Sequence, residues 1–343
     1  MRHLLNTLYV TTQGSYLARE AEAVVIKQDG EACLRLPIHT LSGVVCFGQV
    51  SCSPPLLGLC AERDVAVSFL TEHGKFLARV VGSTHGNVLL RRAQYRIADS
   101  EEPRASIARG MVIGKVSNCR VVLLRAARER PPGPEATELE AAARRLAMIL
   151  SRLESPRPLD EVRGIEGEAA QVYFSSFDHL ITVANEEFFF RGRSRRPPVD
   201  NVNALLSFLY TLLVHDCVGA LETVGLDPAV GYLHADRPGR PGLALDLMEE
   251  FRPFLADRLV VSLINRRQVN ASDFYKTESG AVMMDDASRK EVLVSWQKRK
   301  QEEIQHPFLG ERVPLGLLPY VQALLLARHL RGDLDGYPAF FWR

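Results

Sequence analysis

The chain has 343 residues, 46% of them hydrophobic, and a formal net charge of +1 at neutral pH. This length predicts two domains with enough apolar material for a core. The near-zero charge excludes a protein that binds nucleic acid through its overall charge. Six cysteines without a Cys-x-x-Cys pair fit neither a zinc site nor a secreted disulfide scaffold, so we expect buried free thiols.

The first 85 residues are predicted to form a small β-rich domain. Strands are expected over residues 4–12, 23–27, 32–36, 43–47, 65–70 and 76–81, with a turn at 72–74. Asp29-Gly30 lies between two of these strands and is a strong hairpin signal. Ser53 and Pro54 are typical of a helix N-cap and first turn, so a helix is expected from there to Arg63.

Residues 86–343 are predicted to form a larger, all-helical domain. Helices are expected over 107–130, 135–154, 201–214, 243–261 and 315–331, and a further helix is expected to start near Glu166. Loops are expected at 155–163 and 191–200. The predicted fold class is therefore α+β. No apolar run is expected to span a membrane and no signal peptide is recognised, so we expect a cytoplasmic protein without a membrane partner.

Three acidic residues and one histidine in the second half indicate the chemistry. Glu166 stands in a Gly-Ile-Glu-Gly segment and His234 ends a Gly-Tyr-Leu-His segment. Asp246 and Glu249 stand three residues apart in a predicted helix, which places them on one face. Carboxylates with one imidazole form a mixed oxygen and nitrogen site suited to Mn²⁺ or Mg²⁺. Arginines surround all three places, which favours phosphodiester chemistry.

Each of these residues also has an ordinary explanation. On an isolated helix, Asp246 and Glu249 would form a solvated acidic face. A lone histidine is more often packed than a metal ligand, and a glutamate near a helix start is favoured by the helix dipole. Against this, Leu243 and Leu245 make the first helical turn apolar all round, so we expect that turn to be buried. A buried acidic group needs a partner such as a cation.

Basic residues are clustered, although the total charge is near zero. Runs of charge are usually solvated surface, but the planar guanidinium of arginine suits phosphate. Arg252 has a second interpretation, because it could pair with Glu249 three residues earlier. The candidate DNA-binding residues are Arg191, Arg193, Arg195 and Arg196 in one loop, Arg237, Arg240 and Arg252 nearer the acidic residues, and Lys298 and Arg299 on a predicted helix.

In this order and at these intervals, the motifs resemble those of Cas1, the CRISPR-associated endonuclease and integrase family that inserts new spacers into CRISPR arrays. Residues 5–12, 46–48, 87–92 and 341–343 resemble its subtype I-C branch. The resemblance implies that Glu166, His234 and Glu249 are catalytic metal ligands and that Asp246 is a supporting catalytic carboxylate. It also implies a dimer-forming β domain (1–85), a catalytic helical domain (86–343) and a small dimeric partner, Cas2.

The activity implied by this resemblance is metal-dependent strand transfer on double-stranded DNA. The 3′-hydroxyl ends of a short duplex would be joined to the CRISPR repeat by transesterification, with Mn²⁺ or Mg²⁺ as the cofactor and no covalent protein intermediate. Two other functions fit the same residues. One is a metal-dependent nuclease of branched DNA in repair, and the other is a non-catalytic DNA-binding scaffold.

Overall fold

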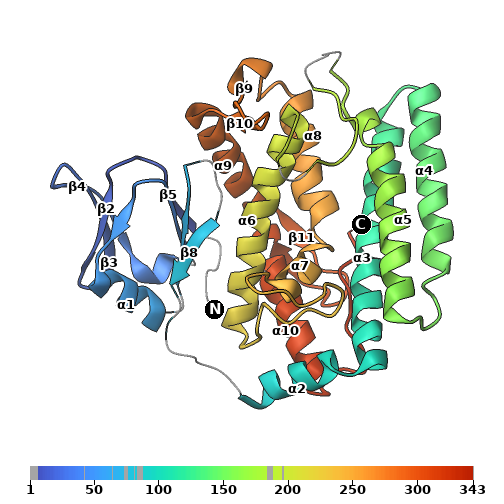
Figure 1. The fold of residues 1–343 in the computed structure, drawn as a ribbon, viewed down its shortest axis with the longest axis horizontal. Coiled ribbons are helices and arrows are strands. Elements are labelled where there is room, and N and C mark those ends of the chain that lie inside the picture. The colour runs from blue at the N-terminus through green and yellow to red at the C-terminus, as the bar shows by residue number, and fades with distance from the viewer. Residues whose placement is uncertain are drawn as a thin grey trace. The chain divides into compact units, whose positions relative to one another are not determined.

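The computed structural model describes residues 7–41, 43–63, 65–72, 76–80, 82, 88–183, 188–194 and 197–342. Residues 4–6 of the first predicted strand, residues 73–74 of a predicted turn, and Arg195 and Arg196 lie outside the described residues. The chain separates into two compact units: residues 1–86 with 289–302, and residues 87–288 with 303–343. Strands dominate the first unit and helices the second (Figure 1), which confirms the α+β class.

In its described residues, the first unit contains two four-stranded sheets and α1 (Pro54–Glu62) around a shared core, together with most of α9 (Asp286–Gln301). One sheet has the order β1 (Thr7–Val10), β5 (Gly43–Phe47), β7 (Ala66–Leu70) and β8 (Phe76–Val80). The other has the order β4 (Glu31–Pro37), β3 (Ala23–Gln28), β2 (Tyr16–Glu20) and β6 (Ser51–Cys52). Buried Leu17 and Val44, one from each sheet, and Leu59 of α1 (Pro54–Glu62) belong to one apolar cluster. Burial of this cluster drives the unit together.

Two local predictions in this unit are confirmed. Asp29 and Gly30, between β3 and β4, both have positive φ angles of 50° and 87°, as a two-residue hairpin turn of type I′ requires. The Ser53 side chain accepts a hydrogen bond from the Leu56 amide at 3.3 Å, and Pro54 opens α1. The turn and the cap depend only on neighbouring residues, and for this reason the sequence alone predicted them correctly.

The cysteines are free thiols, but they are not uniformly buried as expected. Cys46, Cys60, Cys119 and Cys217 are buried, whereas Cys33 is exposed and Cys52 is half-buried. Cys33 lies in β4, which is exposed along most of its length.

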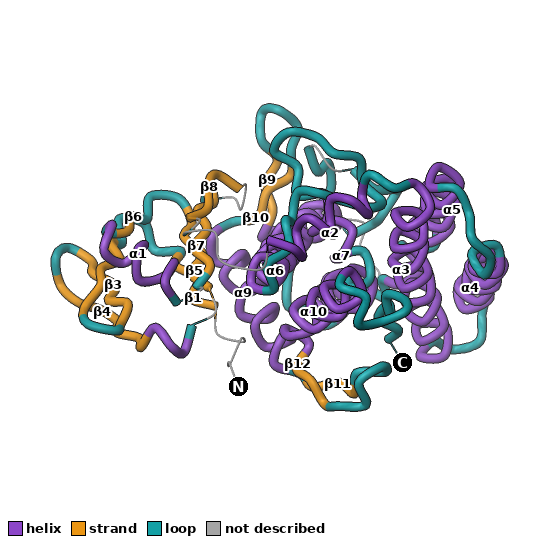
Figure 2. The backbone as a smooth tube through the Cα atoms, turned by 90° about the horizontal axis from the view of Figure 1, so that it is seen from below, coloured by secondary structure: helices purple, strands orange, loops and turns teal. Residues whose placement is uncertain are grey.

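The second unit is a helical bundle. In Figure 1, and again in the rotated view of Figure 2, α3 (Glu101–Glu129), α4 (Pro134–Ser151) and α5 (Leu159–Ser175) lie side by side. The helix α6 (Asn201–Thr223) packs against α7 (Gly242–Met248) and α10 (Leu318–Leu330). The remaining helices are α2 (Val88–Ala98), α8 (Arg258–Asn265) and α9 (Asp286–Gln301), the last of which continues into the first unit.

Two short antiparallel hairpins were not predicted. They are β9 (Phe274–Lys276) with β10 (Val282–Met284), and β11 (Glu303–Gln305) with β12 (Arg312–Pro314). Each strand has three residues, which is too short for an alternating pattern of apolar side chains to stand out.

The helix α6 contradicts the expectation that no apolar run could span a membrane. Its 23 residues, with a mean hydropathy of 1.7 over the most apolar 18-residue window, are sufficient by length and composition. One such helix is weak evidence for a span, because a core helix has the same composition. Slightly more than half of its most apolar window is buried within the protein. Packing against α7 and α10 accounts for that composition.

Several predicted helix boundaries were wrong. The helix α3 begins at Glu101 rather than at residue 107, and α6 continues to Thr223 rather than ending at residue 214. Residues 155–163 were predicted as a loop, but α5 begins at Leu159, directly after Pro158. Its first turn carries Asp160, an acidic residue that the helix dipole stabilises there. The predicted helix over 243–261 is interrupted, because α7 ends at Met248 and a π-helical turn over Arg252–Asp257 precedes α8. Pro253 lacks the amide hydrogen that a regular helix needs.

The C-terminal residues pack onto α3 through Asn118. Its Nδ2 donates to the carbonyl oxygens of Glu250 (2.7 Å) and Phe340 (3.0 Å), and its Oδ1 accepts from the Trp342 amide (2.7 Å). The neighbouring Gly114 permits this approach, because a Cβ there would lie 3.2 Å from the Glu250 Cγ. The segment Tyr337–Trp342, called the C-terminal tail below, is thereby fixed to the middle of α3.

Glu250 is fully buried and joins the C-terminal tail to α7. Its Oε1 accepts from the Tyr337 hydroxyl at 2.6 Å, and its Oε2 accepts from the Phe340 amide at 2.7 Å and from Gln322 Nε2 at 3.1 Å. Burial raises the pKa of Glu250 to about 8, although these three donors oppose the shift. The carboxyl group is therefore protonated over most of the neutral range.

The raised pKa of Glu250 predicts that the free energy of unfolding depends on pH. The folded state keeps a proton that the unfolded chain, with an ordinary pKa of 4.5, releases. This stabilisation is fully present below about pH 4.5 and is lost as pH rises through about 8, by on the order of a few kcal/mol. Urea unfolding between pH 5 and 8 should show this loss in wild type. It should be smaller in Glu250→Gln, whose neutral amide can donate to Tyr337.

The control is Glu138→Gln, which alters an exposed glutamate on α4 and should retain the wild-type pH dependence. Equal pH dependence in wild type and Glu250→Gln would contradict the prediction.

Candidate active site

Glu166 lies two turns into α5, not at its start as the sequence suggested. Val162, Ala169 and Tyr173 on the same side of α5 are buried, so Glu166 faces the interior of the unit with its side chain 26% exposed. Its Oε1 accepts a hydrogen bond from Lys115 Nζ on α3. Attraction to the helix dipole falls off after the first turn and therefore does not explain this glutamate.

Asp246 fixes the loop that carries His234. The Asp246 Oδ2 accepts from the amides of Tyr232 (2.6 Å) and Leu233 (2.9 Å). Its Oδ1 accepts from the His234 amide at 3.0 Å and lies 2.5 Å from the His234 Nδ1. With four contacts to this loop, Asp246 has little capacity left for a further ligand. Because Nδ1 is bound to Asp246, the ring nitrogen left for a metal or substrate is Nε2.

Two glycines let the His234 loop approach α7. A Cβ on Gly231 would lie 2.9 Å from the Gly242 carbonyl carbon and from the His234 carbonyl oxygen, and 3.1 Å from the Asp246 Oδ2. A Cβ on Gly242 would lie 2.7 Å from the Ala229 carbonyl oxygen. Side chains cannot occupy these positions without moving the backbone. The glycines therefore determine the position of the histidine.

The acidic residues of α7 and the turn after it are buried, not solvated. Asp246, Glu249 and Glu250 are at most 5% exposed. Arg252 Nη1 donates to Glu249 Oε1 at 2.7 Å, and Lys115 Nζ lies 2.6 Å from Glu249 Oε2. Burial by itself would raise the pKa of Glu249, but Arg252 and Lys115 outweigh it and hold the pKa well below its usual range. Glu249 is therefore ionised inside the protein.

Lys115 is the site residue that the sequence analysis missed. It is 5% exposed, and it contacts both Glu166 and Glu249. Burial alone would lower the pKa of Lys115, but Glu249 and Glu166 raise it overall. The sequence could have indicated Lys115 through its position in α3. Met111 and Val122, one and two turns away on the same face of the helix, are core residues. A lysine at a core position predicts a buried ion pair.

A second polar network lies behind Arg252. Its guanidinium stacks over the Tyr210 ring at 4.2 Å, and the Tyr210 hydroxyl donates to Asp257 at 2.5 Å. Asp257 also accepts from the Tyr173 hydroxyl at 3.1 Å. Burial raises the pKa of Asp257 to about 6. The network fixes Arg252 from the side opposite Glu249.

These contacts bring the predicted acidic residues and histidine to one region of the unit. Lys115 joins Glu166 on α5 to Glu249 after α7. Arg163 Nε donates to the Leu233 carbonyl at 2.8 Å and so links α5 to the His234 loop. His234 is also close enough to contribute to the lowered pKa of Glu249.

The donor set suits a divalent cation, although the side chains do not already form a closed cluster. Within the described part of the chain, no three His, Cys, Asp or Glu side chains are placed to hold a metal as they stand. The Glu249 Oε2 is nevertheless a buried carboxylate oxygen whose neighbouring cation is Lys115, with Nζ at 2.6 Å. With the Glu166 carboxylate and the His234 Nε2, it forms a mixed donor set suited to Mn²⁺ or Mg²⁺.

The candidate DNA-binding residues have different surroundings. Arg193 is half-buried and donates to Asn203 Oδ1 at 2.6 Å and to Ser207 Oγ at 3.1 Å, so it is engaged inside the unit. Arg191 is exposed and stacks over the Phe189 ring at 4.7 Å. Arg252 was predicted either to bind DNA or to pair with Glu249, and in the structure it forms the ion pair with Glu249.

The other basic candidates lie in other segments of the chain. Arg237 is exposed and Arg240 is half-buried in the loop before α7. Lys298 is exposed, and Arg299 forms an ion pair with Glu302; all three of these residues belong to the first unit.

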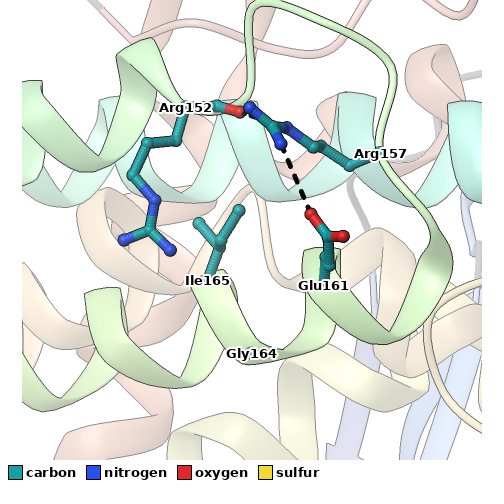
Figure 3. Close-up of a pocket in the computed structure, with 5 residues that line it drawn as sticks. All are labelled: Arg152, Arg157, Glu161, Gly164 and Ile165. Atoms are coloured by element: carbon teal, nitrogen blue, oxygen red, sulfur yellow. Dashed lines mark hydrogen bonds and ion pairs between the residues drawn. The ribbon is translucent and has the colours of Figure 1, made fainter.

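Two hollows adjoin α5 on different sides. Figure 3 shows the first, beside Gly164 and Ile165, where Arg157 and Glu161 form an ion pair of 3.5 Å and Arg152 lies across from them. Arg152 itself binds Glu168 at 2.6 Å. By helical spacing, Glu161, Gly164 and Glu168 lie on the face opposite Glu166, so this hollow is separate from the candidate site.

The second hollow is a groove that begins one turn after Glu166. Ala170, Gln171 and Phe174 of α5 line one wall, and the backbone and side chains of residues 191–193 line the other. Gly192 has a φ of 147°, which a residue with a side chain rarely adopts. The groove thus lies beside the exposed Arg191, and its lining on α5 starts four residues after Glu166.

Comparison with known proteins gives one consistent result. The sequence pattern of the family described as CRISPR associated protein Cas1 matches residues 8–298. The CRISPR-associated endonuclease Cas1 1 of Chlorobaculum tepidum is 57% identical over 343 residues, which is 100% of both chains. A CAS1 protein from Thermotoga maritima has a TM-score of 0.81 at 24% identity, over 95% of this chain and 97% of that chain. A casposase bound to integration product has a TM-score of 0.83 at 22% identity, over 98% of this chain and 94% of that chain. At these identities, the two structures indicate a shared fold.

The close approach at Gly231 predicts that a single methyl group there is destabilising. Gly231→Ala should lower the free energy of unfolding by roughly 1–3 kcal/mol, because the loop must move away from α7. The matched substitution Gly164→Ala has open space around its Cβ and lies inside a helix, so it should stabilise by about 0.5–1 kcal/mol. Urea unfolding of both variants tests this. A Gly231→Ala variant as stable as wild type would show that the loop is not held as described.

Proposed function

Because this chain belongs to the Cas1 family of CRISPR-associated proteins, we propose that it is a metal-dependent DNA endonuclease and integrase of CRISPR adaptation. It joins the 3′-hydroxyl ends of short DNA duplexes to the CRISPR repeat by transesterification. The observation that supports this proposal is that Lys115 contacts both Glu166 and Glu249, while Asp246 binds the His234 ring. All three have the chemistry of ligands for a hard or borderline cation.

Glu166, the His234 Nε2 and the Glu249 Oε2 would hold Mn²⁺ or Mg²⁺, which when bound supplies a Lewis acid for the scissile phosphate. Asp246 orients the His234 ring through Nδ1 and leaves Nε2 as the nitrogen available to a metal. Arg252 neutralises one oxygen of Glu249, so the carboxylate stays ionised at its buried position. These two contacts pre-organise the site before substrate arrives.

The reaction needs no protein nucleophile. In integration, a DNA 3′-oxygen attacks the phosphorus of the repeat, a new phosphodiester bond forms, and the bond to the old 3′-oxygen breaks. In hydrolysis, water takes the place of the attacking hydroxyl. The proton leaves with solvent, and the displaced 3′-oxygen takes one up.

The groove beside α5 supports a path for the DNA backbone towards the site. Arg191 is exposed at its rim, and Gly192 leaves the loop without a side chain next to Gln171. Contacts of this kind provide affinity without sequence preference. Arg195 and Arg196 extend the same basic run in the sequence. Arg237 and Arg240 would act from the loop before α7, and Lys298 and Arg299 would act from the first unit.

Further parts of the proposal rest on family membership and on sequence. We infer that the β-rich unit (residues 1–85) forms a homodimer, and that dimers assemble with Cas2 on double-stranded DNA. Residues 5–12, 46–48, 87–92 and 341–343 are the basis for assigning the chain to the subtype I-C branch. The protein would act in the cytoplasm, where CRISPR arrays are located.

Replacing a metal ligand should remove strand transfer but leave DNA binding. Glu166→Ala and His234→Ala are expected to lower the joining of a labelled short duplex to a repeat-bearing plasmid at least about a hundredfold in Mn²⁺. Binding of the same duplex should change little, since the backbone contacts lie elsewhere. The matched control is Glu168→Ala, on the opposite face of α5, which should join DNA at the wild-type rate.

The products of this assay separate the alternatives. Cutting without joining, with Cas2 present, would favour the repair nuclease. Duplex binding without either reaction would favour the non-catalytic scaffold. Loss of binding together with activity in both variants would indicate that these residues are structural.

The groove predicts a specific effect of Arg191. Arg191→Ala should weaken duplex binding several-fold and reduce the slope of log affinity against log salt by about 1, because one phosphate contact is lost. Arg331→Ala, which removes an exposed arginine paired with Asp333 on the same unit, is the control. Fluorescence anisotropy between 50 and 200 mM salt, a range in which such contacts are sensitive, measures both variants. An unchanged slope in Arg191→Ala would exclude Arg191 from the DNA path.

A further inference from the structure

The Lys115 ammonium lies beside two of the carboxylates that would bind the proposed metal. It contacts Glu166 and lies 2.6 Å from the buried Glu249 Oε2. These two carboxylates belong to the proposed metal ligands. An ammonium and a divalent cation therefore have the same two partners in a region of low solvent access.

We propose that Lys115 is an internal counter-cation that competes with the metal for Glu166 and Glu249. While the site holds no metal, Lys115 neutralises the two carboxylates and keeps α3, α5 and α7 together. When Mn²⁺ or Mg²⁺ binds, Lys115 gives up at least one of these contacts. This inference rests on the proposed metal-dependent function and describes how metal binding at that site is regulated.

The two cations beside Glu249 differ in their capacity to move. Arg252 binds the other oxygen, Oε1, and is fixed by its stacking over Tyr210. Lys115 has a flexible four-carbon side chain and is placed between two helices, with Gly114 next to it in α3. The Glu166 side chain is 26% exposed, which gives the ammonium a path towards solvent. Of the two, Lys115 is therefore the one that can withdraw.

Competition has a thermodynamic consequence that is reciprocal. If the metal weakens the contacts of Lys115, Lys115 weakens the binding of the metal by the same factor. Removing the ammonium should then tighten metal binding, even though the lysine is adjacent to the ligands. A lysine that only holds the ligands in place would have the opposite effect, because its loss would disorder the site.

The first test measures Mn²⁺ binding by isothermal titration calorimetry in the full-length protein without DNA. Lys115→Met is expected to lower the Kd for Mn²⁺ about tenfold or more relative to wild type. It should melt at a lower temperature than wild type in EDTA, and Mn²⁺ should raise its melting temperature by more than that of wild type. The control is Lys276→Met, which alters an exposed lysine on β9 of the same unit.

A measurement on wild type covers the case in which Lys115→Met does not fold. Acetylation of lysines, followed by mass spectrometry, should be faster at Lys115 with Mn²⁺ than in EDTA, whereas Lys276 should be unaffected. Equal or weaker Mn²⁺ binding by Lys115→Met would overturn the proposal, as would unchanged labelling of wild-type Lys115. If neither wild type nor Lys115→Met binds Mn²⁺, the proposed metal-dependent function fails instead.

Discussion

The ion pairs of Lys115 with Glu166 and Glu249 are the interactions on which the helical unit depends. They connect α3, α5 and the turn after α7 at a point where water has little access. Removal of one member of a buried ion pair typically costs about 3–5 kcal/mol, because the remaining charge is left without a partner. Such a value is a large fraction of the total stability of a domain. The three segments must therefore keep their relative positions.

The neighbouring polar contacts follow from that constraint. Asp246 uses both of its oxygens on the His234 loop, and Gly231 allows the loop to come close enough. On the other side, Asp257 and Tyr210 hold Arg252 against Glu249. Each charged group thus has its own set of partners, so the site can be rigid without a bound ligand. Rigid placement of this kind is what electrostatic catalysis requires.

The sequence could predict those parts of the site that lie in short motifs. Glu166, His234, Asp246 and Glu249 each stand beside glycines or apolar residues that mark their segments. Lys115 was missed because its partners are far away in the chain, 51 residues in the case of Glu166, and nothing near Lys115 indicates them. Helical spacing could have found it as a charged residue at a core position of α3.

The same limit applies to the fold. The hairpin at Asp29-Gly30 and the cap at Ser53 depend on neighbouring residues, and both were predicted correctly. The end of α7 and the burial of Glu250 depend on contacts that form only when the chain is folded. On its own, the pattern around Asp246 equally describes a solvated helix.

The C-terminal tail has a consequence for the order of events during synthesis. Glu250 accepts a hydrogen bond from the Phe340 amide, and the guanidinium groups of Arg125 and Arg258 lie over the Trp342 ring at 4.1 and 4.7 Å. None of these contacts can form while the ribosome still encloses the residues around Phe340. The polar centre between α3 and α7 is therefore completed only after translation of the tail. Until then, a nascent chain would carry a helical unit whose active-site region is open to chaperones and proteases.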